Sequence, residues 1–282
     1  MNHYFKDVEK EDNLNYYMQI GFLAMFIPVF LILFFIKAYY GKFYESNNTK
    51  NENSLLSNLR KIFPVIPSRI SWIIQECPCV FVTLYYLIKY QSKLTAEKII
   101  IISPFLIHYI QRSFIFPFII HSSKNYPFEL TLMALSFCLF NSLIINRSIF
   151  LFSDYDKNDY FSIFCGILIF FVGMFINIYH DFSMSQQRTE NNKKSNASHY
   201  IIPRGFLYEY ISCPNYLGEL TEWFGFILLS KTFSSFVFFV STFCNLFPRA
   251  IKYHQWYKVK FKDEFAKNEK LKARKAIIPF LI

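Results

Sequence analysis

Three polar or aromatic residues interrupt an apolar stretch near residue 75 in a pattern that could support catalysis. Trp72, Gln75 and Glu76 stand at positions i, i+3 and i+4, so a helix would place them on one face. A carboxyl group in apolar surroundings favours its neutral form, which can donate a hydrogen bond to a ligand carbonyl. The same residues could instead mark a helix end at a membrane surface, or form a structural polar pair.

A tyrosine offers a second hydrogen-bond donor in the next apolar stretch. Tyr109 stands beside His108 and shortly before Gln111 and Arg112. A phenol can donate to a carbonyl oxygen and act as a general acid. These residues could equally form an aromatic belt at the membrane surface, with Arg112 extended toward water.

A third group could bind a phosphate-bearing ligand. Asn177 and Asp181 are four residues apart, and Arg188 follows two helical turns later. Such residues could hold the amide, hydroxyl and phosphate groups of a dinucleotide, because arginine binds phosphate bidentately. The chain contains no glycine-rich phosphate loop, so a site of this kind would be assembled from several helices. Solvated residues at a membrane surface are the alternative.

The segment from 199 to 225, HYIIPRGFLYEYISCPNYLGELTEWFG, concentrates ionisable residues between two Phe-rich runs. It carries Arg204, Glu209, Asn215, Glu219 and Glu222. Such groups are costly at membrane depth and usually face a bundle interior or a wet cavity. We therefore expect chemistry in this segment.

The elements that must position these residues are membrane-spanning helices. Of the 282 residues, 53% are hydrophobic and 36 are Phe, and several apolar runs approach the ~20 residues that span a bilayer. The pattern predicts an all-α, polytopic membrane protein with a polar segment at 1–15, a seven-helix domain at 16–248 and a basic tail at 249–282. The seven spans are expected at about 16–38, 70–88, 98–120, 127–146, 160–179, 206–230 and 232–248.

The distribution of charge predicts the orientation. The segments 39–69 and 181–205 and the tail after 248 are basic, whereas the loop 147–159 is acidic. Seven spans place the three basic segments on one side, which the positive-inside rule makes cytosolic. The N-terminus is then lumenal and the C-terminus cytosolic, although the outward loop 89–98 carries three lysines.

Charge and cysteine usage also limit the partners. A basic cytosolic face meets anionic lipid or a phosphate-bearing cofactor, so the net charge of +10 does not require nucleic acid. The six cysteines and six histidines are dispersed and form no zinc pattern, so no metal site is expected. No obligate protein partner is evident.

Several segments resemble the steroid 5α-reductase family, whose members are membrane enzymes that reduce a double bond conjugated to a ketone. The resemblance rests on PSRISWIIQECP at 67–78, GMFINIYHD at 173–181, the run 202–226, NLFPRAIKYHQWYKVKFKDEF at 245–265 and ARKAIIPF at 273–280. The NLFPRA run looks most like the plant branch. Residues 1–66 add nothing to the resemblance.

The resemblance implies a seven-helix bundle in the endoplasmic reticulum membrane, with NADPH entering from the cytosol and a steroid lying among the first four helices. Trp72, Glu76 and Tyr109 match substrate positions, and Trp223 matches an aromatic between the two regions. Gln75 shares the helix face of Trp72 and Glu76 and is expected to contact substrate with them. The matching cofactor positions are Asn177, Asp181, Arg188, Tyr200, Asn215, Glu219, Arg249, Tyr257 and Arg274.

The implied chemistry gives two residues catalytic roles. Hydride from NADPH adds to the β-carbon of the enone, and negative charge develops on the ketone oxygen. Preorganised donors at that oxygen stabilise the transition state, and Tyr109 and protonated Glu76 are the candidates. A proton then reaches the α-carbon, for which water is the expected source.

The chain departs from the family pattern at several positions. Ile201 replaces a frequent basic residue, Phe206 replaces a second glycine, and Tyr253 precedes His254 where some relatives have histidine first. Extra residues also occur in AKNEKLKARK. Because of Ile201, the preference for NADPH over NADH rests on the resemblance alone.

Two other functions remain as alternatives. A reductase of polyprenols or of enoyl-CoA belongs to the same superfamily, but LGELTEWFGF looks more like the steroid branch, and an enoyl-CoA member is expected to carry an N-terminal soluble domain. A transporter or structural membrane protein is the alternative from another class. Broken helices and inverted repeats would favour a transporter, and neither is visible in the sequence.

Overall fold

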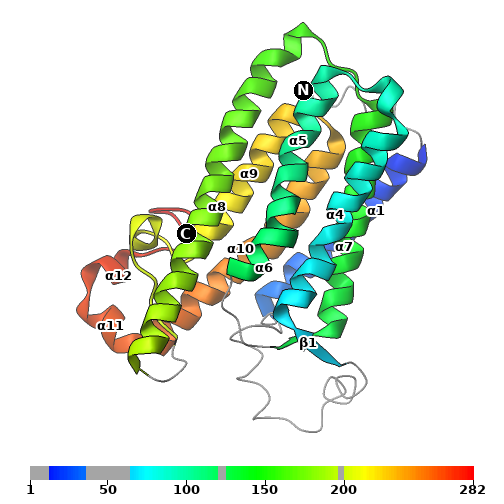
Figure 1. Cartoon of the computed structure of the whole chain (residues 1–282). Helices are drawn as coiled ribbons and strands as arrows, with labels where there is room; N and C mark the ends of the chain where they lie inside the picture. The colour runs from blue at the N-terminus through cyan, green and yellow to red at the C-terminus, as the bar shows by residue number, and fades with distance from the viewer. Residues whose placement is uncertain (1–12, 36–63, 120–124, 196–199) are drawn as a thin grey trace. The chain divides into compact units, whose positions relative to one another are not determined.

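The computed structural model describes residues 13–35, 64–119, 125–195 and 200–282 (Figure 1). Most of the expected N-terminal segment 1–15 and most of the basic segment 39–69 lie outside these residues. The chain divides into two compact units. Unit 1 comprises Met1–Gln19, Lys37–Asp159 and Thr232–Ser234, and unit 2 comprises Ile20–Ile36, Tyr160–Lys231 and Ser235–Ile282.

Among its described residues, unit 1 contains four complete α-helices, and a short strand directly precedes the first and the last of them. Its helices are α4 (Ser68–Lys89), α5 (Ala96–Ile110), α6 (Phe116–Ile119) and α7 (Phe128–Arg147). The strands β1 (Val65–Pro67) and β2 (Asn125–Pro127) pair antiparallel, with Ile66 opposite Tyr126. The π-helical turn η2 (Gln111–Ile115) joins α5 to α6, and a second one, η3 (Ser148–Phe152), follows α7. Short 3₁₀ turns are η1 (Gln91–Lys93) and η4 (Lys157–Asp159).

Helices α4 and α7 pack side by side in unit 1 through a ladder of small polar groups (Figure 1). The ladder consists of Ser71 with Thr131 at 2.8 Å, the Cys79 thiol with the Cys138 carbonyl at 3.3 Å, and Asn146 with Thr83 at 3.0 Å. The partners advance in the same direction along both helices, so the two helices run parallel. Pairing these polar groups satisfies hydrogen-bonding capacity that would be costly to bury unpaired.

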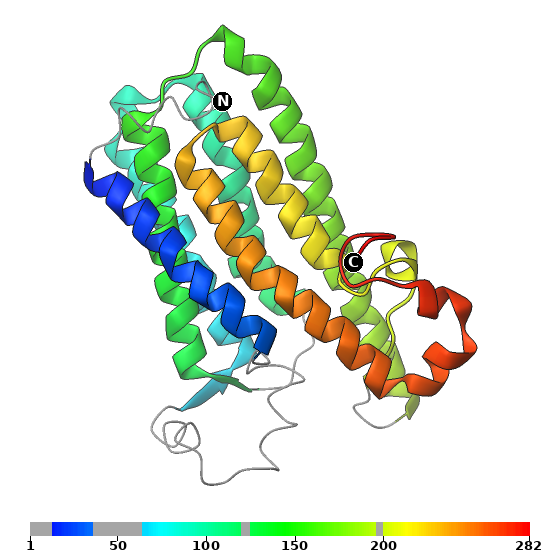
Figure 2. The same ribbon diagram turned by 180° about the vertical axis from the view of Figure 1, so that it is seen from behind.

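Unit 2 is built around three long helices and a folded C-terminal region. It contains most of α1 (Asn13–Phe35), then α8 (Tyr160–Ser195), the 3₁₀ turn η5 (Phe206–Glu209), α9 (Pro214–Ser230), α10 (Phe233–Lys260), α11 (Lys262–Lys267) and α12 (Glu269–Ala273). Figure 2 shows α11 and α12 following directly from the C-terminal end of α10. The chain then returns, and Lys275 pairs with Ile211 in a parallel bridge.

Glycines set the spacing of the antiparallel helices α8 and α9. A methyl group at Gly218 would overlap the main-chain nitrogen of Asn177, and one at Gly173 would overlap that of Glu222. Such small residues let two backbones approach closely, as is common between membrane helices. The close approach brings the polar end of α8 against the first turns of α9.

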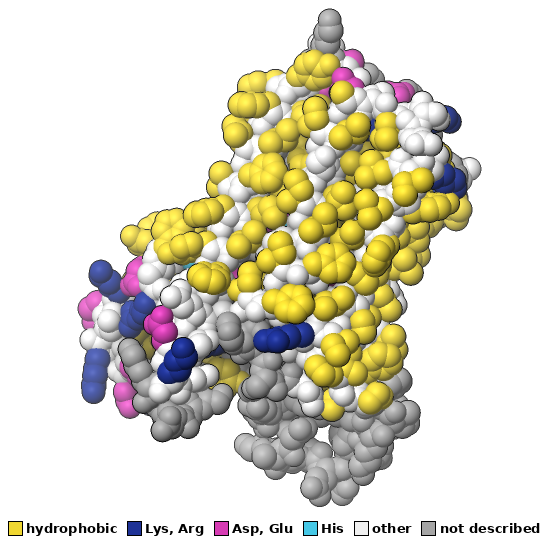
Figure 3. Space-filling view, in the orientation of Figure 1, with side chains coloured by type: hydrophobic (Ala, Val, Ile, Leu, Met, Phe, Trp, Pro, Cys, Tyr) yellow, Lys and Arg dark blue, Asp and Glu magenta, His cyan; other side chains and the backbone are white. Residues whose placement is uncertain are grey.

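The surface and helix lengths are those of a multi-pass membrane protein. Six helices among the described residues are long and apolar enough to cross a bilayer. Along α8, Phe161, Phe164 and Phe175 are 79%, 60% and 60% exposed, and Figure 3 shows hydrophobic side chains over this helix. A soluble protein rarely exposes a continuous apolar face of this kind. The all-α, polytopic architecture predicted from the sequence is therefore supported.

The predicted seven spans are confirmed for six of the described helices, and the seventh, α9, is shorter than the others. Helix α9 has 17 residues and begins at Pro214, whereas the predicted span began at 206. Gly205 adopts φ 90° and Phe206 φ 47°, and Pro214 occupies the first turn of α9, where its missing N–H costs nothing. The chain before Pro214 is therefore a turn, which shortens this helix below the other six.

Two predicted spans are longer in the structure. Helix α8 continues to Ser195 rather than ending near 179, and α10 continues to Lys260 rather than ending at 248. The added stretch of α8 carries a hydrogen bond between Gln186 and Glu190 at 3.2 Å, a pair at i and i+4 that supports a helix. Hydropathy marks only the apolar part of a helix, so it ended both predictions too early.

Candidate functional site

The first candidate cluster lies in unit 1 around the carboxyl group of Glu76. The Cys138 thiol of α7 donates to Glu76 Oε2 at 3.5 Å, and the Cys79 thiol of α4 donates to the Cys138 carbonyl. Glu76 is half-buried. The parallel packing of α4 and α7 thus holds an ionisable group at a sheltered position inside an apolar unit.

Tyr109 joins this cluster from α5. Its side chain is 3% exposed, and its phenol lies beside Cys79 and within electrostatic range of Cys138 and Glu76. The ring also packs on Phe105, with the ring centroids 4.7 Å apart. The structure therefore brings together the two residues that the sequence singled out as donors, although they come from different helices.

Trp72 and Gln75 flank the cluster on α4 in different surroundings. The Trp72 ring meets Phe116 edge-on at 5.1 Å, and the guanidinium of Arg112 lies over both rings. Gln75 is buried and donates to Ser71 Oγ at 2.5 Å. Gln75 thus extends the polar ladder between α4 and α7, while Trp72 sits in an aromatic and cationic stack.

Three further buried polar atoms lie near this cluster in sequence. Gln111 Oε1, Ser113 Oγ and Asn141 Nδ2 find no hydrogen-bond partner among the described residues. Gln111 and Ser113 follow Tyr109 in the π-helical turn, and Asn141 is one helical turn after Cys138. Buried polar atoms are nearly always hydrogen-bonded in native proteins. Their concentration here indicates a place for a polar ligand group or water.

The second candidate cluster lies in unit 2 where α8 meets α9. Asn177 Nδ2 donates to the Asn215 carbonyl at 2.9 Å and to Glu219 Oε2 at 3.4 Å. Asn215 Nδ2 donates to Asp181 Oδ1 at 2.9 Å. Four of the predicted cofactor residues therefore form one hydrogen-bonded network, made possible by the glycine contact between Gly218 and Asn177.

The segment 200–213, which we call the strap, is fixed to α8 and to the C-terminal region. Gln187 donates to the Arg204 carbonyl at 2.8 Å and accepts from the Arg204 N–H at 3.0 Å. The Tyr208 hydroxyl donates to the His180 carbonyl at 3.1 Å. At its far end Ser212 contacts His254 at 2.8 Å. The strap, which no single motif predicts, thus has a defined conformation.

Arg274 is a buried cation behind the strap. It is 1% exposed, and its Nη2 donates to the Pro203 carbonyl at 3.3 Å. Its Nε and Nη1 find no hydrogen-bond partner among the described residues. Burial, with a smaller contribution from Arg204, lowers the pKa of Arg274 to about 10. A desolvated guanidinium with unused donors is a favourable place for a phosphate oxygen.

Other predicted cofactor residues line the same region of unit 2. Arg188 hydrogen-bonds with Tyr257, which is 4% exposed. The Tyr200 ring packs edge-on against Trp256, with the centroids 5.0 Å apart. Through these contacts, α8 and the strap both pack against the C-terminal end of α10.

Arg249 and Trp223 lie deeper in unit 2. Arg249 Nη2 donates to the Tyr216 hydroxyl at 3.0 Å. Trp223 is 1% exposed and packs on Phe170 and Phe238, with centroids at 5.8 and 4.4 Å. Trp223 is therefore a core aromatic of unit 2, and its predicted contact with substrate remains a prediction.

Sequence reasoning did not single out three residues that organise these clusters. Cys138 contacts Glu76, Gln187 fixes the strap, and buried His180 stacks on Phe206 at 5.4 Å. His180 Nε2 finds no hydrogen-bond partner among the described residues. Gln187 stands directly before Arg188 in a polar helix end, which was the one available signal. Cys138 carries no spacing signal at all.

Comparison with known proteins places these clusters in context. The family model for 3-oxo-5-alpha-steroid 4-dehydrogenase matches residues 124–282. "Steroid 5-alpha-reductase DET2" of Solanum lycopersicum is 33% identical over 276 residues, covering 96% of this chain and 98% of the relative. "3-oxo-5-alpha-steroid 4-dehydrogenase 1" of Bos taurus is 37% identical over 226 residues, covering 77% and 82%.

The extent of these matches corrects one prediction. An alignment covering 96% of the chain must extend into the first 66 residues, where the motifs alone showed no resemblance. An apolar span preserves its character through interchangeable residues, so short motifs do not reveal it. From the family model and these relatives together, the chain belongs to the 3-oxo-5-alpha-steroid 4-dehydrogenase (steroid 5-alpha-reductase) family of oxidoreductases.

Proposed function

We propose that this chain reduces the 4,5 double bond of a 3-oxo-4-ene steroid to give the 5α-3-oxosteroid, using NADPH. The observation that carries the proposal is the convergence of Glu76 from α4 and Tyr109 from α5 beside the Cys138 thiol. Two hydrogen-bond donors in one cluster suit a ligand that presents a carbonyl oxygen on a largely hydrophobic body.

The proposed role of Glu76 and Tyr109 is to polarise the ketone. Hydride addition at the β-carbon moves charge onto the ketone oxygen, and donors already in place stabilise that charge without reorganising. The Tyr109 phenol and the protonated Glu76 carboxyl would both donate to this oxygen. Cys138, which hydrogen-bonds with Glu76, would position the carboxyl group.

The proposed substrate contacts of Trp72 and Gln75 follow from their places beside Glu76. The Trp72 ring, which meets Phe116 edge-on beside Arg112, would contribute an apolar contact for the steroid rings. Gln75 is engaged with Ser71, so we assign it the positioning of α4 against α7 in addition to its predicted place near substrate. Trp223 keeps its proposed role as an aromatic near the reacting groups.

The residues of unit 2 fit a dinucleotide. Arg274 has buried guanidinium donors without partners among the described residues, which suits a phosphate. Arg188 and Arg249 belong to the same unit and add positive charge to it. The network of Asn177, Asp181, Asn215 and Glu219 presents amide and carboxylate groups for the amide and hydroxyl groups of the cofactor. Tyr200 and Tyr257 complete the proposed set. When bound, NADPH supplies the hydride.

Family membership favours an oxidoreductase over a transporter or structural protein. Within the superfamily, reduction of a polyprenol or an enoyl-CoA is the competing activity. The names of the plant and mammalian relatives refer to steroid reduction, which supports the steroid as substrate here. A multi-pass location in the endoplasmic reticulum membrane is part of the proposal.

A substrate comparison tests the proposal. The full-length protein in lipid nanodiscs would receive NADPH with progesterone, a polyprenal or a long-chain enoyl-CoA, and NADPH oxidation and products would be measured. We expect oxidation that depends on the 3-oxo-4-ene steroid and yields the 5α product. Oxidation with only the polyprenal or the enoyl-CoA would assign the chain to another branch.

A further inference from the structure

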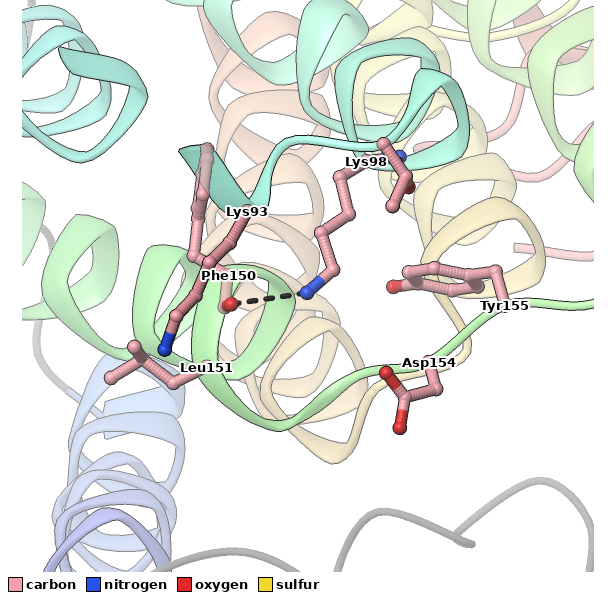
Figure 4. Close-up of a pocket in the computed structure, with 7 residues that line it drawn as sticks. Lys93, Lys98, Phe150, Leu151, Asp154 and Tyr155 are labelled. Carbon is pink, nitrogen blue, oxygen red and sulfur yellow. Dashed lines mark hydrogen bonds between the residues drawn. The ribbon is translucent and has the colours of Figure 1, made fainter. Parts of the chain in front are cut away.

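A cavity of about 360 Å³ lies in unit 1, away from the Glu76 cluster (Figure 4). It is lined by Lys93, Thr95, Lys98, Phe150, Leu151, Asp154 and Tyr155. Lys98 and Tyr109 stand 11 residues apart (109 − 98) on α5, about 16 Å at 1.5 Å per residue. The cavity therefore belongs to neither candidate cluster described above.

The local fold drives a lysine side chain into this cavity. Thr95 caps α5 by accepting from the Lys98 N–H at 3.3 Å, which fixes Lys98 in the first turn. The Lys98 ammonium donates to the Phe150 carbonyl at 3.1 Å, a main-chain group in the π-helical turn η3. Lys98 is only 9% exposed, so its charge is largely removed from water.

The cavity presents both signs of charge. Figure 4 shows the Lys98 ammonium and the Tyr155 hydroxyl pointing into the same space, with the Asp154 carboxylate beside them. An ammonium and a hydroxyl can both donate to a phosphate oxygen. A carboxylate accepts from an ammonium group. Donors and an acceptor this close together suit a ligand that is itself a zwitterion.

The surroundings point to a lipid. The cavity stands where α4 has ended at Lys89 and α5 begins at Ala96, that is, at the ends of two helices able to span the membrane. Ile99 and Ile100, directly after Lys98, are 45% and 46% exposed. Apolar side chains beside a polar cavity would accompany acyl chains below a head group.

We propose that this cavity binds the head group of a zwitterionic phospholipid of the phosphatidylethanolamine type. The phosphate would accept from Lys98 and Tyr155, and the primary ammonium would donate to Asp154. A bound lipid of this kind would tie the α4–α5 turn to the segment after η3. The site would also account for lysines in the 89–98 loop, which the charge rule placed on the non-cytosolic side.

Lipid binding to the purified, delipidated full-length protein would be measured by native mass spectrometry. Phosphatidylethanolamine, phosphatidylcholine and phosphatidylglycerol would be titrated separately. We expect one phosphatidylethanolamine to bind about tenfold more tightly than phosphatidylglycerol, because only the former has an ammonium for Asp154. Lys98→Met should weaken binding of phosphatidylethanolamine about tenfold or more, and Asp154→Asn should abolish the preference between these two lipids.

Controls separate this site from general charge and from misfolding. Lys89→Met removes the same charge from the end of α4, in the same turn between α4 and α5, without altering a lining residue, and it should leave binding unchanged. Tyr155→Phe provides a second test should Lys98→Met fail to fold. It removes one hydroxyl group from the cavity and should weaken lipid binding a few-fold. Equal loss in Lys89→Met, or unchanged lipid binding with only a lower melting temperature in Lys98→Met, would overturn the proposal in favour of an internal ion pair.

A soluble competitor distinguishes a lipid from a free phosphate ester. Phosphoethanolamine carries the same charged groups without acyl chains. We expect it to displace the lipid only at concentrations about a hundredfold higher, because it lacks the apolar contacts. Equal potency of phosphoethanolamine would assign the cavity to a soluble ligand and contradict the lipid.

Discussion

At the scale of single residues, the proposed mechanism depends on two hydrogen-bond donors, Tyr109 and Glu76, that belong to one cluster in unit 1. The carboxyl group of Glu76 accepts from Cys138, and the phenol of Tyr109 lies within electrostatic range of both residues. A carboxyl group can donate to the ketone oxygen only while it carries a proton. Apolar surroundings strengthen each hydrogen bond to a developing oxyanion.

The first prediction concerns these donors. Tyr109→Phe and Glu76→Ala should each lower turnover about 100- to 1000-fold, the usual cost of an oxyanion donor, while the Kd for NADPH changes less than about twofold. Glu76→Gln should retain part of the activity because its amide still donates. Single-turnover NADPH oxidation with 3-oxo-4-ene steroid and a binding titration would measure both effects.

The matched control for these variants is Cys77→Ser, which changes a half-buried side chain on the same helix. Its thiol contacts the Ile74 carbonyl of its own helix, so turnover should stay near the wild-type rate. Near-wild-type turnover in both Tyr109→Phe and Glu76→Ala would remove the catalytic assignments.

The second prediction concerns the buried cation. Arg274→Met should weaken NADPH binding about 10- to 100-fold, because it removes a charge-assisted contact to phosphate from a dry site. Isothermal titration of the dinucleotide would measure this without relying on activity. Lys272→Met, a half-exposed neighbour paired with Glu269, should bind NADPH as the wild type does. Unchanged affinity in Arg274→Met would exclude Arg274 from the phosphate site.

At the scale of elements, close helix packing and a fixed strap arrange the polar groups. The glycines of α8 and α9 allow Asn177 to reach Asn215 and Glu219, and the strap closes over the polar end of α8 through Gln187. Neither device needs ionisable residues of its own. Each can therefore be tested by substituting a residue that is not itself a proposed ligand contact.

The third prediction tests the glycine packing. Gly218→Ala places a methyl group against the Asn177 main chain, and relief of that overlap should cost about 1–3 kcal/mol of stability. Thermal unfolding in detergent would show a lower melting temperature. Gly21→Ala on α1 meets nothing within 4 Å and should be neutral or slightly stabilising, since alanine favours helix. An equal effect of both substitutions would contradict the close approach of α8 and α9.

The fourth prediction tests the strap. Gln187→Leu removes both hydrogen bonds to Arg204, at about 1 kcal/mol each, so amide exchange at Arg204 should accelerate about fivefold or more. Gln186→Leu is the control, because Gln186 is exposed and contacts only Glu190 among the hydrogen bonds described here. Hydrogen exchange read by mass spectrometry compares the two. Equal exchange in both variants would show that Gln187 does not hold the strap.

Sequence patterns predicted the apolar helices well but their ends poorly. Hydropathy predicted seven spans, and six of them correspond to described helices long and apolar enough to cross a bilayer. It missed the polar continuation of α8 and placed the start of α9 next to what is a turn at Gly205. Helical spacing put Trp72, Gln75 and Glu76 together, because they share one helix. It could not show that Tyr109 and Cys138 join them, because contacts between helices depend on packing rather than on local spacing.

At the scale of the whole molecule, the two candidate clusters have different proposed roles, steroid binding and NADPH binding. The residues proposed for the steroid fall in unit 1, except Trp223, and those proposed for NADPH fall in unit 2. Each unit has its own packing device, a polar ladder in unit 1 and glycine contacts in unit 2. The relatives that match over nearly the whole chain indicate that both units belong to one enzyme.

The transfer of labelled hydride tests the central claim most directly. The full-length protein in nanodiscs would receive progesterone with NADPH carrying deuterium at the transferable position of the nicotinamide, and the product would be analysed by mass spectrometry and NMR. The account predicts a 5α-reduced steroid with deuterium at C5, the β-carbon of the enone, and a solvent-derived proton at C4. A steroid recovered unreduced, or deuterium at any other carbon of the product, would contradict it.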